Sequence, residues 1–88
     1  MRKCIANYLN KINNEVFNLF DEDVSFKTNL TNYINLYNKL DIMYNEVVTM
    51  YWSDFINYEE QAILQDAIYD AKDTYAKLLE NLAVENNA

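Results

Sequence analysis

Residues 29–52 read NLTNYINLYNKLDIMYNEVVTMYW, and the apolar side chains of this stretch recur at intervals of three and four. One line of them comprises Leu30, Tyr33, Tyr37, Leu40, Tyr44, Val47 and Tyr51, and a second line beside it comprises Leu36, Met43 and Met50. This spacing is the heptad pattern of a helix that packs against other helices. At about 100° per residue, the two lines cover roughly 200° of the helix surface. An apolar face this wide predicts a central helix over residues 29–52 that contacts two neighbours.

Helical patterns also precede and follow this central segment. The first predicts a helix from Lys3 to Phe20, with apolar positions Ile5, Tyr8, Leu9, Ile12, Val16, Leu19 and Phe20. The second predicts a helix from Tyr58 to Ala83, with apolar positions Leu64, Ile68, Ala71, Tyr75, Leu78 and Leu82. Each set falls on one side of its helix. The last residues, ENNA, are expected to fray.

The first link between the predicted helices is polar and contains helix-start residues. It reads DEDVSFKT over residues 21–28. Ser25 and Thr28 are residue types that cap the beginning of a helix. We expect the apolar side chains of Val24 and Phe26 to cover the end of the core.

The second link, SDFINYEE at residues 53–60, has the spacing of a capping box. Asn57 precedes Glu60 by three residues, so each side chain is placed to accept a hydrogen bond from the other residue's backbone N–H. Ser53 is a further cap candidate. Because the link contains neither Gly nor Pro, a single bent helix that continues through it remains an alternative.

The composition predicts one all-α domain. The chain has 88 residues, about half of them apolar, and contains no Gly and no Pro. A length of this order is typical of a single domain, and an apolar content of this order is typical of a folded one. Tight β-hairpins depend on Gly, whereas long helices with short polar links need neither residue. We therefore predict that residues 1–88 form a small three-helix bundle with antiparallel, up-down-up topology.

The charge is concentrated in the second half of the chain. The formal net charge is -7. Residues 1–40 contain five basic and four acidic residues, whereas residues 41–88 contain two basic and ten acidic residues. Direct binding to nucleic acid needs a basic patch, which this distribution does not provide. The field of such a chain attracts the basic surfaces of other proteins instead.

The residue types needed for most catalytic and metal chemistry are absent or isolated. The chain contains no His, which is the commonest general base and transition-metal ligand. Without Gly it cannot form a Gly-rich phosphate loop, and Asp21, Glu22 and Asp23 lack the Gly of a calcium-binding loop. Cys4 is the single cysteine and has no base beside it in the sequence. We predict a protein that is not an enzyme and that uses no cofactor and no metal.

The same features predict an intracellular, cytoplasmic protein. A lone cysteine excludes a disulfide framework within the chain. No apolar run has the length of a membrane span, so we expect no membrane association. The basic start, MRKC, is not followed by the continuous apolar stretch of a secretory signal.

The third predicted helix carries a line of carboxylates opposite its apolar side. Glu59, Asp66, Asp73 and Glu80 are seven residues apart, and Asp70 falls in the same sector, within about 80° of arc. Only Lys77 relieves their repulsion. The simplest interpretation is a solvated face that keeps the protein soluble.

Apolar and aromatic residues in the same sector indicate a second interpretation, a binding surface. Ile63 lies among the carboxylates, and Tyr58 and Tyr69 flank them. Aromatic residues are enriched in protein interfaces. Carboxylates about 6 and 10 Å apart along a helix have a spacing comparable to that of phosphates along a nucleic acid. The predicted partner-binding residues are Glu59, Ile63, Asp66, Tyr69, Asp70, Asp73 and Glu80.

The stretches YWSDFINYEE and QDAIYDAKDTYAKLLE give the second half of the chain a recognisable character. An acidic, Tyr-rich helical domain of fewer than a hundred residues without catalytic groups resembles small phage-encoded inhibitors that imitate nucleic acid, among them antirestriction and anti-CRISPR proteins. The resemblance implies an inhibitor, acting in the cytoplasm of the host cell, whose acidic face occupies the basic nucleic-acid-binding surface of a nuclease or CRISPR effector. The near-neutral first half departs from this character.

A helical interaction or regulatory module without nucleic-acid mimicry is the alternative function. The apolar arc of residues 29–52 is wide for a three-helix monomer. A homodimer that shares Tyr33, Leu36, Met43 and Met50 would bury the excess. Solution mass distinguishes this alternative from a monomeric inhibitor.

Overall fold

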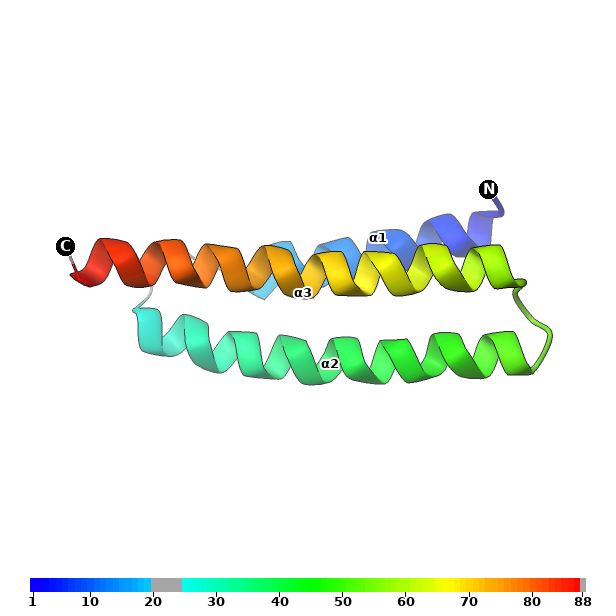
Figure 1. The fold of residues 1–88 in the computed structure, drawn as a ribbon, viewed down its shortest axis with the longest axis horizontal. Helices are drawn as coiled ribbons and strands as arrows, with labels where there is room; N and C mark the ends of the chain where they lie inside the picture. Colours follow the sequence, from blue (N-terminus) through cyan, green and yellow to red (C-terminus); the bar gives the residue numbers. More distant parts are fainter. Residues whose placement is uncertain (20–24, 88) are drawn as a thin grey trace.

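Three helices run side by side in an antiparallel bundle in the computed structural model, which describes residues 1–19 and 25–87. Helix α1 covers Lys3–Leu19, α2 covers Phe26–Trp52 and α3 covers Tyr58–Asn87. Helices α1 and α3 point one way and α2 points the other (Figure 1). Each helix contacts both others, and the bundle measures 50 × 20 × 16 Å. The predicted all-α, up-down-up architecture is confirmed.

The start of α2 is fixed by a serine cap. The Oγ atom of Ser25 accepts a hydrogen bond from the backbone N–H of Thr28 at 3.2 Å. Ser25 is thus the capping residue, as predicted, and α2 begins three residues before the predicted Asn29. Phe26 packs against the core, as expected. The predicted roles of Val24 and of the acids at 21–23 lie outside the described residues.

A defined turn separates α2 from α3. Ser53 ends α2, and Asp54 has a φ of 60° in the left-handed region. At the start of α3, the N–H of Glu60 donates to Asn57 Oδ1 at 2.8 Å, and the N–H of Asn57 donates to Glu60 Oε1 at 3.0 Å. The predicted capping box is confirmed, and a single bent helix through this region is wrong.

The buried line of α2 lies between the two lines that the sequence suggested. It consists of Asn29, Leu36, Leu40, Met43 and Val47. Two residues of the first line, Leu30 and Tyr37, are wrong as core predictions, because their side chains are exposed. Two neighbouring helices cover only the middle of the 200° arc, so its edges stay in solvent. Asn29 was missed because a buried polar residue has no hydrophobic signal; its carbonyl accepts a hydrogen bond from the Tyr75 hydroxyl at 3.4 Å.

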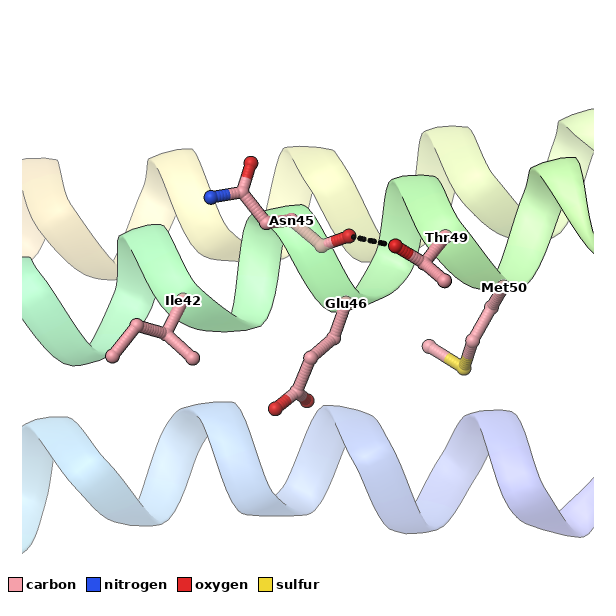
Figure 2. A pocket seen from close by; sticks show the side chains of 5 residues that line it. All are labelled: Ile42, Asn45, Glu46, Thr49 and Met50. Atoms are coloured by element: carbon pink, nitrogen blue, oxygen red, sulfur yellow. Dashed lines mark hydrogen bonds between the residues drawn. The ribbon is translucent and has the colours of Figure 1, made fainter.

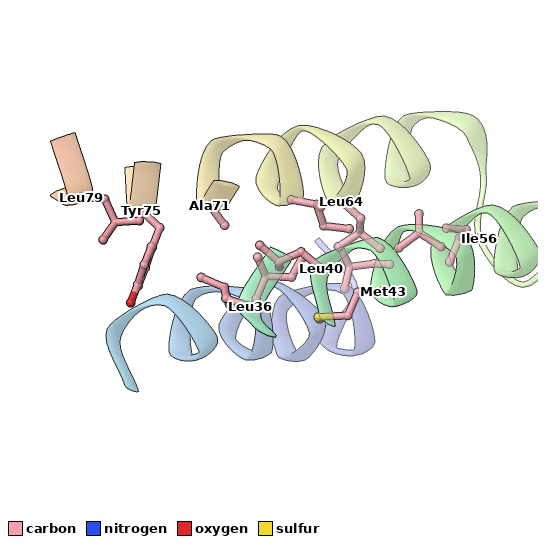
Figure 3. Close-up of a cluster of buried hydrophobic side chains, with 12 residues drawn as sticks. Leu36, Leu40, Met43, Ile56, Leu64, Ala71, Tyr75 and Leu79 are labelled. Carbon is pink, nitrogen blue, oxygen red and sulfur yellow. The ribbon is translucent and has the colours of Figure 1, made fainter. Parts of the chain in front are cut away.

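Helix α3 buries the predicted residues Leu64, Ile68, Ala71 and Tyr75, followed by Leu79 (Figure 3). Leu79 therefore takes the buried place predicted for Leu78. The helix continues to Asn87, so the predicted end at Ala83 is wrong. The fraying of the last residues, ENNA, stays a prediction.

In α1, Ile5 and Ile12 are buried, as predicted. Tyr8 and Leu9 pack against the core. The side chains of Val16, Leu19 and Phe20 lie outside the described residues.

Two of the four residues predicted for a homodimer interface are buried within a single chain. Leu36 and Met43 are buried, and Tyr33 and Met50 pack against the core cluster. The ring of Tyr33 stacks on that of Tyr75 of α3, with centroids 5.6 Å apart. Leu36 and Met43 are therefore wrong as residues of a dimer interface, because the core of one chain already buries them. Tyr33 and Met50 keep part of their side chains in solvent, and their part in a dimer stays a prediction.

Candidate acidic protein-binding surface

The structure places all seven predicted binding residues on the solvent side of α3. Their side chains are exposed, including Ile63 at 40% and Tyr69 at 56%. We call the carboxylates of Glu59, Asp66, Asp70, Asp73 and Glu80 the acidic face. At 1.5 Å per residue, it extends over about 31 Å along the helix. The capping box begins α3 at a fixed residue, and the burial of Leu64 and Ile68 turns the acidic face outward.

One lysine pairs with the acidic face. Lys77 Nζ lies 2.9 Å from Asp73 Oδ2, and both side chains are more than half exposed. The hydrogen bond that Lys77 donates to Asp73 raises the pKa of Lys77, and the nearby charges of Glu80 and Asp70 raise it further. Among the described residues, the other four carboxylates form no ion pair. The acidic face thus keeps most of its negative charge.

The second lysine of α3 is directed to α2. Lys72 pairs with Asp41 and lies 4.1 Å from the centroid of the Tyr37 ring. Burial alone would lower the pKa of Lys72, but the hydrogen bond and charge of Asp41 raise it. Lys72 therefore neutralises a carboxylate of α2 and is not available to the acidic face.

The two tyrosines that flank the acidic face also contact α2. The ring of Tyr69 meets that of Tyr44 edge-on, with centroids 5.7 Å apart, and Tyr58 approaches Tyr51 at 6.4 Å. Both tyrosines therefore contribute to the α2–α3 contact as well as to the surface beside the carboxylates. Each nevertheless keeps more than half of its side chain in solvent.

Arg2 and Glu60 form an ion pair that sequence reasoning missed. Arg2 Nε lies 2.6 Å from Glu60 Oε2, and Arg2 Nη2 lies 2.6 Å from Glu60 Oε1. Arg2 Nη2 also donates to the carbonyl of Phe55 at 3.0 Å. The pair joins the start of α1 to the start of α3 across 58 positions, a separation at which no local pattern signals a contact. The bidentate hydrogen bond from Arg2, helped by the N–H of Asn57, lowers the pKa of Glu60 to about 2.

This ion pair makes the stability of the bundle depend on pH in the acidic range. Because the pKa of Glu60 is lower in the folded state than its usual 4.5, its contribution is full above pH 4.5 and is lost as the pH falls toward about 2. We expect Glu60→Gln to flatten the fall of the melting temperature between these two values. Glu59→Gln, one position away on the exposed side, is the matched control. Identical pH profiles for Glu60→Gln and the wild type would contradict the assignment.

A shallow groove lies on α2 beside α1 (Figure 2). It has a volume of about 540 Å³ and is lined by Ile42, Asn45, Glu46, Thr49 and Met50. Ile42, Glu46 and Met50 point toward α1 in this view. The Tyr8 hydroxyl lies 3.0 Å from Glu46 Oε2, and burial together with this carboxylate raises the pKa of Tyr8. The lining of the groove contains one carboxylate, that of Glu46, and one hydroxyl, that of Thr49.

The remaining candidate chemistry is sparse in the described part of the chain. No group of three or more His, Cys, Asp or Glu side chains there could hold a metal ion. Cys4 is exposed. None of the helices among the described residues combines the length and apolar character needed to cross a membrane.

Comparison of the chain with models of protein families, with curated proteins and with solved structures gives no match.

Proposed function

We propose that this chain is a non-enzymatic inhibitor that binds a nucleic-acid-processing protein, such as a CRISPR effector or a restriction nuclease, through the acidic face of α3. The observation that carries the proposal is the line of five exposed carboxylates on α3, with a single lysine paired to it. The partner presents a basic nucleic-acid-binding surface, and the acidic face takes the place of the phosphate backbone there.

The geometry of the acidic face suits a surface that binds phosphates. Carboxylates four and seven positions apart lie about 6 and 10 Å from one another along a helix. Each carboxylate accepts two hydrogen bonds from one arginine, as a phosphate does. Because α3 is packed on α1 and α2, the helix backbone that carries the carboxylates is already fixed before binding. This preorganisation lowers the entropic cost of association.

Ile63 gives the same surface an apolar contact. Its side chain is 40% exposed among the carboxylates, where solvent contact brings no stabilisation. A partner that covers Ile63 gains affinity through burial of apolar area. This apolar contribution to affinity does not depend on charge. A loss of affinity on changing Ile63 therefore indicates a specific protein contact and not only attraction between opposite charges.

Replacement of Asp66, Asp70 and Asp73 by Asn tests the proposal. We expect the folded bundle to keep its melting temperature, because repulsion falls while one exposed ion pair is lost. Affinity for the partner, co-purified from the host cell, should fall by about tenfold or more at low salt and by less at high salt, where screening already weakens the wild-type attraction. An excess of duplex DNA should displace the wild-type protein. Ile63→Ser should weaken binding with little dependence on salt.

The matched control removes two carboxylates elsewhere. Asp41→Asn with Glu46→Gln changes the net charge as much as Asp66→Asn with Asp70→Asn, but acts on α2. If the acidic face imitates phosphates, the α3 pair weakens binding more than the α2 pair. Equal effects of both pairs would show that net charge alone, and not the position of the carboxylates on α3, attracts the partner. If the triple Asn variant of Asp66, Asp70 and Asp73 binds like the wild type, these carboxylates serve only to keep the protein soluble.

A homodimeric interaction module is the second candidate function, favoured by the exposed apolar residues of α2. Leu30, Ile34 and Tyr37 lie on its solvent side. Beside them is a groove of about 240 Å³ between α2 and α3, lined by Phe26, Leu30, Tyr33, Ala76, Leu79, Glu80 and Ala83. Sedimentation equilibrium distinguishes the two candidates: a dimer that Ile34→Ser dissociates favours the interaction module, and a monomer favours the inhibitor.

A further inference from the structure

Three large aromatic side chains project into solvent at the turn between α2 and α3: Trp52 ends α2, Phe55 lies in the turn and Tyr58 begins α3. Trp52 is 77% exposed, Phe55 61% and Tyr58 70%. We call these three residues the aromatic turn. It occupies the end of the bundle where α2 passes into α3, beside the N-terminus (Figure 1). A connecting segment is normally polar, and soluble monomers rarely group large apolar side chains at the surface without a function.

The backbone beneath the aromatic turn is held by hydrogen bonds to the last turn of α2. The N–H groups of Ser53 and Asp54 donate to the carbonyls of Thr49 and Tyr51, at 2.9 and 3.1 Å. Those of Phe55 and Ile56 donate to the carbonyl of Met50 at 2.9 and 3.3 Å. Four consecutive N–H groups are therefore satisfied within the protein, which ties the turn to the end of a helix.

Two further contacts anchor the same segment. Ile56 inserts its side chain into the core (Figure 3). Arg2 Nη2 holds the carbonyl of Phe55 while the guanidinium is paired with Glu60. Aromatic side chains on a backbone already fixed in place lose little conformational entropy when they bind.

The core uses Ile56 and leaves the three aromatic rings outside. Two of the three rings contact that of Tyr51 edge-on: the Trp52 ring at a centroid distance of 5.7 Å and the Tyr58 ring at 6.4 Å. Trp and Tyr, together with Arg, are the residues that dominate binding energy in protein interfaces. The composition and rigidity of the aromatic turn are those of an anchor for a protein partner.

Charge indicates the chemistry of that partner. Asp54 and Glu59 are exposed next to the aromatic side chains, and Arg2, the cation that contacts the turn, is already paired with Glu60. The surface therefore combines open aromatic faces with unpaired carboxylates. An arginine side chain matches both, since its guanidinium stacks on aromatic rings and binds carboxylates in a bidentate manner. The chain itself makes a similar combination on α2 and α3, where Lys72 pairs with Asp41 and lies over the Tyr37 ring.

We propose that the aromatic turn binds an arginine-bearing basic segment of a partner protein. A second copy of this chain, or an anionic membrane, fits less well because the net charge is -7 and the turn carries two carboxylates. The aromatic turn shares the neighbouring Glu59 with the acidic face but lies apart from Asp66, Asp70 and Asp73, and the proposal does not rest on the proposed function.

Trp52 makes the proposal directly testable, because it is the single tryptophan of the chain and lies in the aromatic turn. The probe is a synthetic peptide with three arginines separated by Gly and Ser, compared with versions that carry Lys or Glu in their place. We expect the arginine peptide to change Trp52 fluorescence in a saturable way. The lysine peptide should bind several-fold more weakly, since an ammonium group attracts rings and carboxylates only as a point charge, whereas a guanidinium also stacks flat on a ring and binds a carboxylate in a bidentate manner. The glutamate peptide should cause no change.

Variants locate the binding surface. Phe55→Ser and Tyr58→Ser remove exposed side chains, and each should weaken binding of the arginine peptide by about tenfold. Ile42→Ser is the matched control, because Ile42 is 60% exposed on another part of the surface. In the triple Asn variant of Asp66, Asp70 and Asp73, the effect of Phe55→Ser should persist.

Several outcomes would overturn the proposal. One is a fluorescence change equally large for the lysine peptide, or one that neither Phe55→Ser nor Tyr58→Ser alters. Another is a Trp52 response to protein concentration alone, or to phosphatidylserine vesicles in place of the peptide. Loss of the Phe55→Ser effect in the triple Asn variant would assign peptide binding to the acidic face instead.

Discussion

Leu40→Asp is expected to lower the free energy of unfolding by more than about 4 kcal/mol, leaving the chain largely unfolded at 25 °C. Leu40 is fully buried in the middle of α2, within the cluster that joins all three helices. The substitution removes apolar burial worth about 2–5 kcal/mol. It also places a charge, or a protonated carboxyl with no partner, among aliphatic side chains, which carries a further cost. A domain of 88 residues has little stability in reserve.

The measurement for Leu40→Asp is a urea or thermal unfolding curve followed by far-ultraviolet circular dichroism. Asn14→Asp is the control, since it introduces the same charge at an exposed position of α1. We expect this control to shift stability by no more than about 0.5 kcal/mol. Similar melting temperatures for the two variants would show that α2 does not occupy the centre of the bundle.

Tyr75→Ala has the second-largest expected effect, about 3–5 kcal/mol of lost stability. Tyr75 is the largest fully buried side chain of the bundle's described part. Its ring stacks on Tyr33 of α2 with an interplanar angle of 19°. Truncation to Ala empties a large volume where α2 and α3 meet, and long helices have limited freedom to collapse into it.

Tyr75→Phe separates the hydroxyl from the ring. The hydroxyl donates to the carbonyl of Asn29 at 3.4 Å, which is a long hydrogen bond. Removing it while keeping the ring should lower stability by only about 1 kcal/mol. If the Phe variant were as unstable as the Ala variant, the polar contact with Asn29, and not packing against Tyr33, would be the main contribution of Tyr75.

The acidic face shows how far periodicity alone leads at a candidate site. Glu59, Asp66, Asp73 and Glu80 repeat every seven residues, and Leu64 and Ile68 define the opposite side of the same helix. Because both sets belong to one helix, their relative directions follow from helix geometry. The structure accordingly places all of these carboxylates in solvent. That they bind a partner stays a prediction, which the Asn variants test.

The spacing of residues along the chain did not predict the contacts between helices. Arg2 and Glu60 are 58 positions apart and meet only because α1 and α3 begin at the same end of the bundle. Tyr69 belongs to the predicted binding surface, yet its ring also packs on Tyr44 of α2. Each contact joins two different helices, whereas a helical wheel shows only how the residues of one helix are arranged.

The three helices, their order and the Asn57–Glu60 capping box were predictable from sequence, because each depends on residues within a few turns of one another. Tertiary packing selected Asn29 over Leu30 for the core, and Leu79 over Leu78. The hydrophobic arc of a helix is wider than the strip that its neighbours cover, and the positions of those neighbours select which side chains lie inside. In the α2–α3 turn the same selection buries Ile56 and leaves Trp52, Phe55 and Tyr58 in solvent. Hydrophobicity does not separate these four residues; only the direction that the turn gives each side chain does.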